Sequence, residues 1–161
     1  MALPQLLGSG VRLWAAFCDA HRAASVTVRY LHLAGLVVGA GAAVAADWRV
    51  LKAARAGPSQ RGATLAALAH VHRVVMPALA VVVTSGVLLT AADSATFLAS
   101  RLYWTKMGFV ALLLVNGAGL VAAEARAAAG KGWRWLGLFS GASLFLWLLI
   151  LYLGVWLTVA A

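Results

Sequence analysis

Four long apolar stretches dominate the pattern of hydrophobic and polar positions along this chain. They are residues 24–47, 63–92, 102–128 and 135–160. Each holds the roughly 20 predominantly apolar residues that a helix needs to cross a bilayer. Gly57-Pro58 and Gly130-Lys131-Gly132 fall between stretches, where glycine and proline are expected to end a helix. The pattern predicts an all-α fold: an integral membrane four-helix bundle in a single domain, 1–161.

The N-terminal segment, residues 1–22, shows a different periodicity. One helical face is apolar, and its members are Leu7, Val11, Trp14 and Cys18. Polar residues turn to the other side. This pattern is typical of a short amphipathic helix that lies in the membrane interface. A terminal helix that packs on a partner subunit is the alternative.

Composition supports a membrane protein and argues against a soluble enzyme. The apolar fraction is 64% and the mean hydropathy is +0.94, against roughly 45–50% apolar residues in soluble domains. The net charge is +9, but the basic residues gather at the ends of the apolar stretches. We interpret them as topology signals and contacts with anionic lipids, and we expect no nucleic-acid partner.

The distribution of positive charge predicts the orientation in a bacterial-type inner membrane. Of the 13 lysines and arginines, eight lie near the first and third connections: Arg49, Lys52, Arg55, Arg61, Arg73, Arg126, Lys131 and Arg134. Five lie on the opposite side. Because cytoplasmic segments carry the excess of lysine and arginine, both termini are predicted to lie outside the cytoplasm.

His32 is the first candidate for a residue that binds a cofactor. Gly35 and Gly39 follow three and seven residues later, so all three share one helical face. An imidazole binds haem iron, and adjacent glycines leave room for the macrocycle. Small residues at this spacing also let two membrane helices approach closely. Both interpretations remain open from the sequence.

A histidine pair in the second stretch extends the haem hypothesis. His70 and His72 point about 200° apart around a helix, so only one can face a given site. Counted along antiparallel helices, His32 and His72 come to similar depth, within several Å. We therefore expect a haem b between them, with His32 and His72 as metal ligands and His70 as the substitute. Arg73 and Lys106 are candidates to pair with a haem propionate or a quinone head group, or with lipid phosphate.

The sequence contains fewer candidate residues for copper binding or for acid–base chemistry. His72 and Met76 at i and i+4, with Cys18 and His21 near the outer surface, offer soft ligands that suit copper. The chain has only four acidic residues, which are widely spread along the sequence. On that basis, a carboxylate pair or a proton relay is not expected.

Short pieces of the sequence resemble the copper-resistance D-like group and the membrane protoporphyrinogen oxidase (HemJ) group. The pieces are Tyr30–Gly35, Ala46–Leu51, Met76-Pro77-Ala78, Ser85-Gly86, Tyr103–Lys106 and Asn116. In those groups a first-helix histidine is followed by glycine and a basic helix end. The resemblance implies a helical bundle with a haem b or copper role in which His32 matches that histidine. No histidine occurs in the third or fourth stretch, so haem binding is implied more than porphyrinogen oxidation.

The sequence thus favours a membrane b-type cytochrome with bis-histidine haem. Its electron-transfer partner would be a quinone or a membrane redox complex. The expected partners also include the lipid bilayer and, as the alternative to a redox complex, a homo-oligomer. A copper-handling membrane protein is one alternative. A cofactor-free accessory subunit of a membrane complex is the other.

The orientation can be tested by cysteine labelling in intact cells. An impermeant thiol reagent should leave Arg55→Cys unlabelled, because that connection is predicted to be cytoplasmic. Arg101→Cys, on the opposite side, should react. Strong labelling of Arg55→Cys without labelling of Arg101→Cys would reverse the assignment.

Overall fold

The chain folds into helices throughout its described part. The computed structural model describes residues 3–160, and it describes side chains for residues 8–159. Within this range there is no strand, and the helices are α1 (Leu3–Ala20), α2 (Arg22–Arg55), α3 (Pro58–Ala92), α4 (Ser94–Ala99), α5 (Arg101–Ala128) and α6 (Trp133–Ala160). Four of them, α2, α3, α5 and α6, are long and apolar enough to cross a membrane. The predicted all-α membrane bundle is confirmed.

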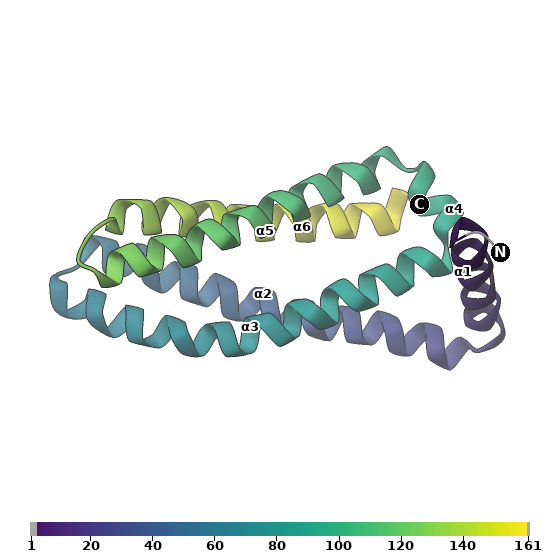
Figure 1. The fold of residues 1–161 in the computed structure, drawn as a ribbon, viewed down its shortest axis with the longest axis horizontal. Helices are drawn as coiled ribbons and strands as arrows, with labels where there is room; N and C mark the ends of the chain where they lie inside the picture. Colours follow the sequence, from purple (N-terminus) through teal and green to yellow (C-terminus); the bar gives the residue numbers. More distant parts are fainter. Residues whose placement is uncertain (1–2, 161) are drawn as a thin grey trace.

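The bundle consists of two helical hairpins laid against each other (Figure 1). α2 packs along α3, α5 packs along α6, and α2 joins the hairpins by packing on α6. Contacts between α3 and α5 are sparse, which leaves that side of the bundle the least packed. We call the end with the α2–α3 and α5–α6 connections the loop end. The opposite end, which carries α1 and α4, is the α4 end.

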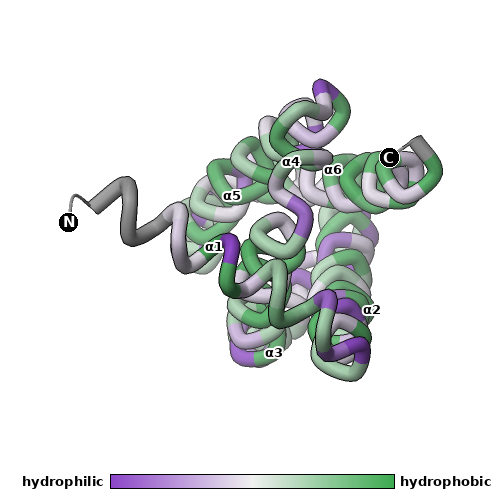
Figure 2. Tube along the Cα trace, turned by 90° about the vertical axis from the view of Figure 1, so that its right-hand side faces the viewer, coloured by the Kyte–Doolittle hydropathy of each residue, from purple (hydrophilic) through white to green (hydrophobic). Residues whose placement is uncertain are grey.

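The outer surface of the long helices is apolar. Exposed large hydrophobic side chains occur on all four of them, for example Val37, Val87, Val115 and Val155. Figure 2 shows hydrophobic positions spread over the helices when the bundle is viewed from the α4 end. Since lipid is as apolar as these side chains, burying them gains little, and close packing must hold the helices together.

Glycines provide that packing between α2 and α3. A Cβ atom at Gly35 would lie 2.9 Å from Cγ2 of Val82, and one at Gly39 would lie 3.0 Å from Cβ of Ala78. Both distances are too short for a real side chain. The small-residue pattern of α2 therefore serves helix contact, the second of the two interpretations that the sequence left open.

The helix ends agree with the turn signals, with one difference. The Asp93 side chain accepts a bond from the backbone N–H of Thr96 at 3.4 Å and caps α4. Gly130 and Gly132 adopt φ values of 78° and 86°, which favour glycine, and they end α5. α2, however, continues to Arg55 rather than ending near residue 47.

α1 packs its predicted apolar face on the bundle. Cys18 is buried, and Nε1 of Trp14 donates to the carbonyl of Leu88 in α3 at 2.9 Å. Leu13 and Phe17 on the other side remain exposed. The side chain of Leu7 lies outside the described residues. α1 thus contacts α3 and still offers apolar side chains to a membrane interface.

One tryptophan of α6 lies in the core rather than in the interfacial belt where membrane tryptophans are enriched. Trp147 is 6% exposed and packs in the middle of the bundle. Its buried neighbours there are Ala40, Leu113, Leu146 and Ile150. Trp135 and Trp156, near the ends of α6, are exposed as expected for belt residues.

The glycine contact yields a stability prediction. Gly39→Leu should lower the unfolding free energy by about 1–3 kcal/mol, because the added side chain forces α2 and α3 apart. Gly41→Leu is the matched control, since a Cβ at Gly41 meets nothing within 4 Å. Unfolding in mixed detergent micelles measures both. Equal stability of the two variants would contradict the close contact.

Candidate functional site

His32 lies at the interface of α2 with α3, where residues of α3 hold one nitrogen of its ring. Nδ1 is 3.1 Å from the carbonyl oxygen of Val82 and 3.0 Å from Oγ of Ser85. Gly86 leaves the space for the ring, because a Cβ there would lie 3.3 Å from Cε1 of His32. The residue is half-buried.

These contacts assign the imidazole tautomer. The Val82 carbonyl can only accept a hydrogen bond, and the Ser85 hydroxyl donates its own hydrogen to the carbonyl of Val81. Nδ1 of His32 must therefore carry the proton. The lone pair of the neutral ring is on Nε2, the arrangement found when a backbone carbonyl orients a metal-binding histidine.

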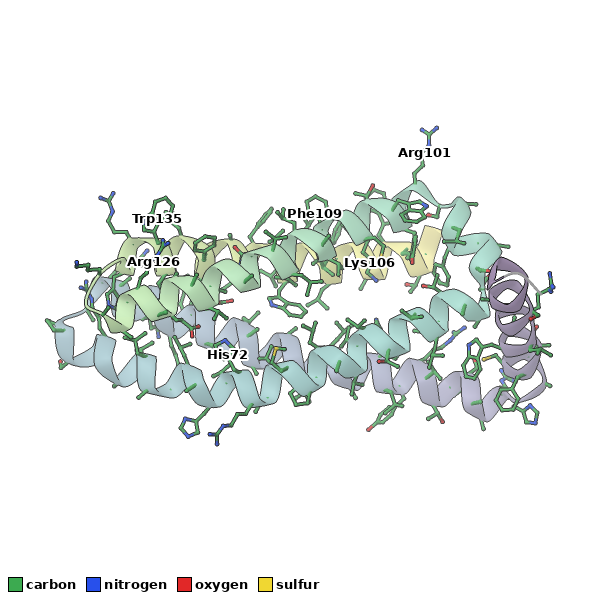
Figure 3. All side chains as sticks on the ribbon, in the orientation of Figure 1. His72, Arg101, Lys106, Phe109, Arg126 and Trp135 are labelled. Carbon is green, nitrogen blue, oxygen red and sulfur yellow. The ribbon has the colours of Figure 1, made fainter. Side chains whose placement is uncertain are left out.

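Lys106 lies on the inner side of α5, in electrostatic range of His32. Its Nζ lies beside Gly154 of α6, 3.5 Å from the position that a Cβ there would occupy. Figure 3 shows Lys106 directed inward, whereas Arg101 points away from the bundle. No hydrogen bond or ion pair joins its ammonium group to another described side chain. We call His32, Ser85, Gly86 and Lys106 the His32 site.

His72 belongs to a different part of the bundle. Its Nε2 is 3.7 Å from Oε1 of Glu124, across the α3–α5 side. His32 contacts α3 at Ser85, which is 13 residues, or about 20 Å, along α3 from His72. The structure does not bring His32 and His72 together. In this arrangement they do not clamp one haem between them.

The other predicted ligand and propionate candidates in α3 also lie away from His32. His70 is exposed and lines a shallow outer groove with Arg49, and its Nδ1 is 3.4 Å from the carbonyl of Ala66 in its own helix. Arg73 is exposed as well. His70 and His72 do point to different sides, as their spacing predicts.

The predicted role of Gly35 and Gly39 in making room for a macrocycle does not fit this arrangement. Val82 and Ala78 occupy the space beside them. A flat cofactor has no space between α2 and α3 along that face. Any group that binds His32 must approach Nε2 from elsewhere.

The copper candidates lie in two separate parts of the bundle. Cys18 is buried at the α4 end, and the exposed His21 stacks on Phe17 with ring centroids 4.3 Å apart. His72 and Met76 lie near the middle of α3. Among the described residues, no three His, Cys, Asp or Glu side chains come together as a metal-ligand set.

A polar cluster that the sequence did not predict lies near the loop end. It draws one or two side chains from each long helix: Asp47 of α2, His72 of α3, Glu124 of α5, and Ser140 and Ser143 of α6. Asp47 is 5% exposed and is in electrostatic range of Glu124. Two of the four acids, which are far apart in the sequence, thus lie in electrostatic range of each other. We call these five side chains the Asp47 cluster.

The Asp47 cluster contains unsatisfied polar atoms. The Asp47 carboxylate faces the hydroxyls of Ser140 and Ser143. Even so, Oδ2 of Asp47 and Oγ of Ser140, both fully enclosed, have no hydrogen bond of good geometry. A buried polar group left unpaired costs about 1–3 kcal/mol, so this cost must be offset by a function or a small bound partner.

The sequence did hold a signal for this cluster. Intramembrane acids are functional candidates by default, but Asp47 is the last residue of the predicted crossing stretch, 24–47. Asn116 has a different role from the acids. Its Nδ2 donates to the carbonyl of Phe139 at 3.1 Å and ties α5 to α6.

Comparison with known proteins adds no relative from which a role can be transferred. The chain matches no family model, no curated protein and no solved structure. The functional argument therefore depends on the residues themselves.

The tautomer of His32 can be read by ¹⁵N NMR of histidine-labelled protein. We expect one neutral imidazole whose Nδ1 is protonated and whose Nε2 is not, and its signals should vanish in His32→Ala. His70→Ala, the control, should keep them. A His32 ring protonated at Nε2 alone would contradict the contact with the Val82 carbonyl.

Proposed function

We propose that this protein binds a b-type haem through Nε2 of His32 and serves in electron transfer within the membrane. The observation that carries the proposal is the fixed imidazole. Val82 and Ser85 hold Nδ1, which leaves Nε2 as the ligand atom. A bound haem would supply one-electron chemistry that a chain with this composition cannot provide by itself.

Lys106 supports the same site. Lys106 is half-buried, and an ammonium group without an anionic partner is costly inside a membrane, where such residues mark binding sites. Its position near His32 fits a haem propionate, which carries the opposite charge. A quinone head group or the propionate of a partner's cofactor has the same acceptor chemistry.

The sparse contacts between α3 and α5 support a route of access. Two helices that make few contacts can separate enough to admit a planar cofactor or a lipid-soluble partner from the bilayer. His32 and Lys106 come from α2 and α5, so a group that engages both would bridge the two hairpins. Gly35 and Gly39 have no role in this proposal beyond helix packing.

The proposal differs from the bis-histidine arrangement predicted from sequence. His32 is kept as the axial ligand from this chain, and His72 is assigned to the Asp47 cluster. A second axial ligand is not needed for haem binding, since many haem proteins use a single histidine. We place the protein in a bacterial-type inner membrane with both termini outside the cytoplasm, where a quinone or a membrane redox complex is the partner.

The visible spectrum of the purified protein tests the proposal. Wild type should show a Soret band and a reduced α band, and His32→Ala should lose them. Ser85→Ala should weaken haem affinity by about tenfold, since it removes a group that orients the ligand. His72→Ala is the matched control and should keep its full haem content.

Other spectra would support the alternatives. Bound copper without a Soret band would favour a copper-handling protein. Absence of both haem and metal from protein purified with its native lipids would favour an accessory subunit. Loss of haem in His72→Ala alone would move the ligand to the Asp47 cluster and contradict the assignment of His32.

A further inference from the structure

The Asp47 cluster offers a second site that the haem proposal does not use. Asp47 is nine-tenths buried or more, and Ser140 is fully buried, at 5% and 0% exposure. The Ser140 hydroxyl faces the Asp47 carboxyl group, yet neither Oδ2 of Asp47 nor Oγ of Ser140 has a hydrogen bond of good geometry. A carboxylate oxygen accepts and a hydroxyl can donate or accept. Two such orphaned atoms side by side point to a small ligand that bonds to both.

No cation neutralises Asp47 within the described residues. α6 faces it with Ser140 and Ser143, and its one arginine, Arg134, is exposed at the helix start. α5 contributes the second acid, Glu124, while Arg126 is exposed.

α3 contributes His72, which contacts Glu124 rather than Asp47. On α2 itself, Arg49 is exposed. A carboxylate enclosed in a low-dielectric interior without a counter-charge is strongly disfavoured. The cluster must therefore take up positive charge of its own.

We propose that the Asp47 cluster is an internal proton-binding site. Asp47 holds one exchangeable proton and shares it with Ser140 through a single bound water. Glu124 and His72 connect the site to the less packed α3–α5 side, where the His72 side chain is 40% exposed. A proton accepted at Nε2 of His72 passes to Glu124 and then to Asp47, and His72 returns to its neutral form. No electron and no other bond is involved.

Helix geometry favours a proton over a metal cation such as Na⁺. In membrane proteins, Na⁺ is commonly coordinated by backbone carbonyls that a broken helix releases. α2 and α6 are continuous through Asp47, Ser140 and Ser143, so their carbonyls are engaged in helical bonds. The side-chain oxygens alone make an incomplete shell for a hard cation. Chains of Asp, Glu and His inside a membrane bundle are typical of proton pathways.

Infrared spectroscopy of the full-length protein in lipid nanodiscs tests the proposal. At neutral pH, wild type should show the C=O stretching band of a protonated carboxyl group that shifts in D₂O. Asp47→Asn should lose the band. Asp93→Asn is the matched control, because Asp93 is exposed at the α3–α4 turn, and it should keep the band.

Two further variants separate a proton site from a merely structural one. Ser140→Ala should shift the band without removing it, because the bonds to Asp47 change while the carboxyl group remains. His72→Gln should slow hydrogen–deuterium exchange of the band and leave its position in place. If Asp47→Asn does not fold, the Ser140→Ala shift decides the assignment.

Three outcomes would overturn the proposal. A spectrum without a protonated carboxyl band would mean that Asp47 stays ionised. A band that appears only when Na⁺ is replaced by K⁺ would mean a sodium site. A band that is unchanged in Ser140→Ala would place the proton on another acid. Since His32 lies outside the cluster, the haem spectrum of Asp47→Asn reports separately on the proposed function.

Discussion

The close contact between α2 and α3 fixes the register in which the histidines of these two helices lie. In a membrane the two helices could slide past each other at little cost, because lipid and protein surfaces are equally apolar. Gly35 against Val82 and Gly39 against Ala78 remove that freedom, since each pair fits in one register. This register sets His32 beside Ser85 and sets His72 far from it, near the level of Asp47. Small residues in α2 thus decide which polar groups can meet.

The same contact explains which parts of the molecule can be predicted from sequence. Hydropathy and turn residues predict the four spanning helices, the α4 cap and the glycine stop after α5. They do not predict register, because the apolar surfaces of α2 and α3 are compatible with many alignments. The predicted depth match of His32 and His72 counted residues from span starts near 24 and 63. The register of α2 on α3 instead sets His32 beside Ser85, which is 13 residues along α3 from His72.

The Asp47 cluster could not be predicted from the sequence, and the physical reason is a different one. Its members come from four helices, and Asp47 and Glu124 are 77 residues apart in the sequence. No spacing rule links them, since their proximity results from the packing of α2 on α6 and of α6 on α5. The sequence does show that an acid lies inside an apolar stretch, where burying its charge is costly. This observation identifies a single residue as a candidate, but it does not say which other groups lie near it.

An apolar layer separates the two polar sites, and the order of groups is the same along α2 and α6. On α6 the two cluster serines come first, then Leu146, Trp147 and Ile150, then Gly154 beside Lys106. On α2, Ala40 lies between Asp47 and His32. Such a layer excludes the chains of water that protons need to cross the bundle, whereas electrons tunnel through packed side chains. Our two proposals therefore describe two separate sites in one bundle. The proposed redox site lies toward the α4 end, and the proposed proton site lies toward the loop end. Trp147, buried between them rather than in the interfacial belt, is the largest barrier to any direct proton exchange.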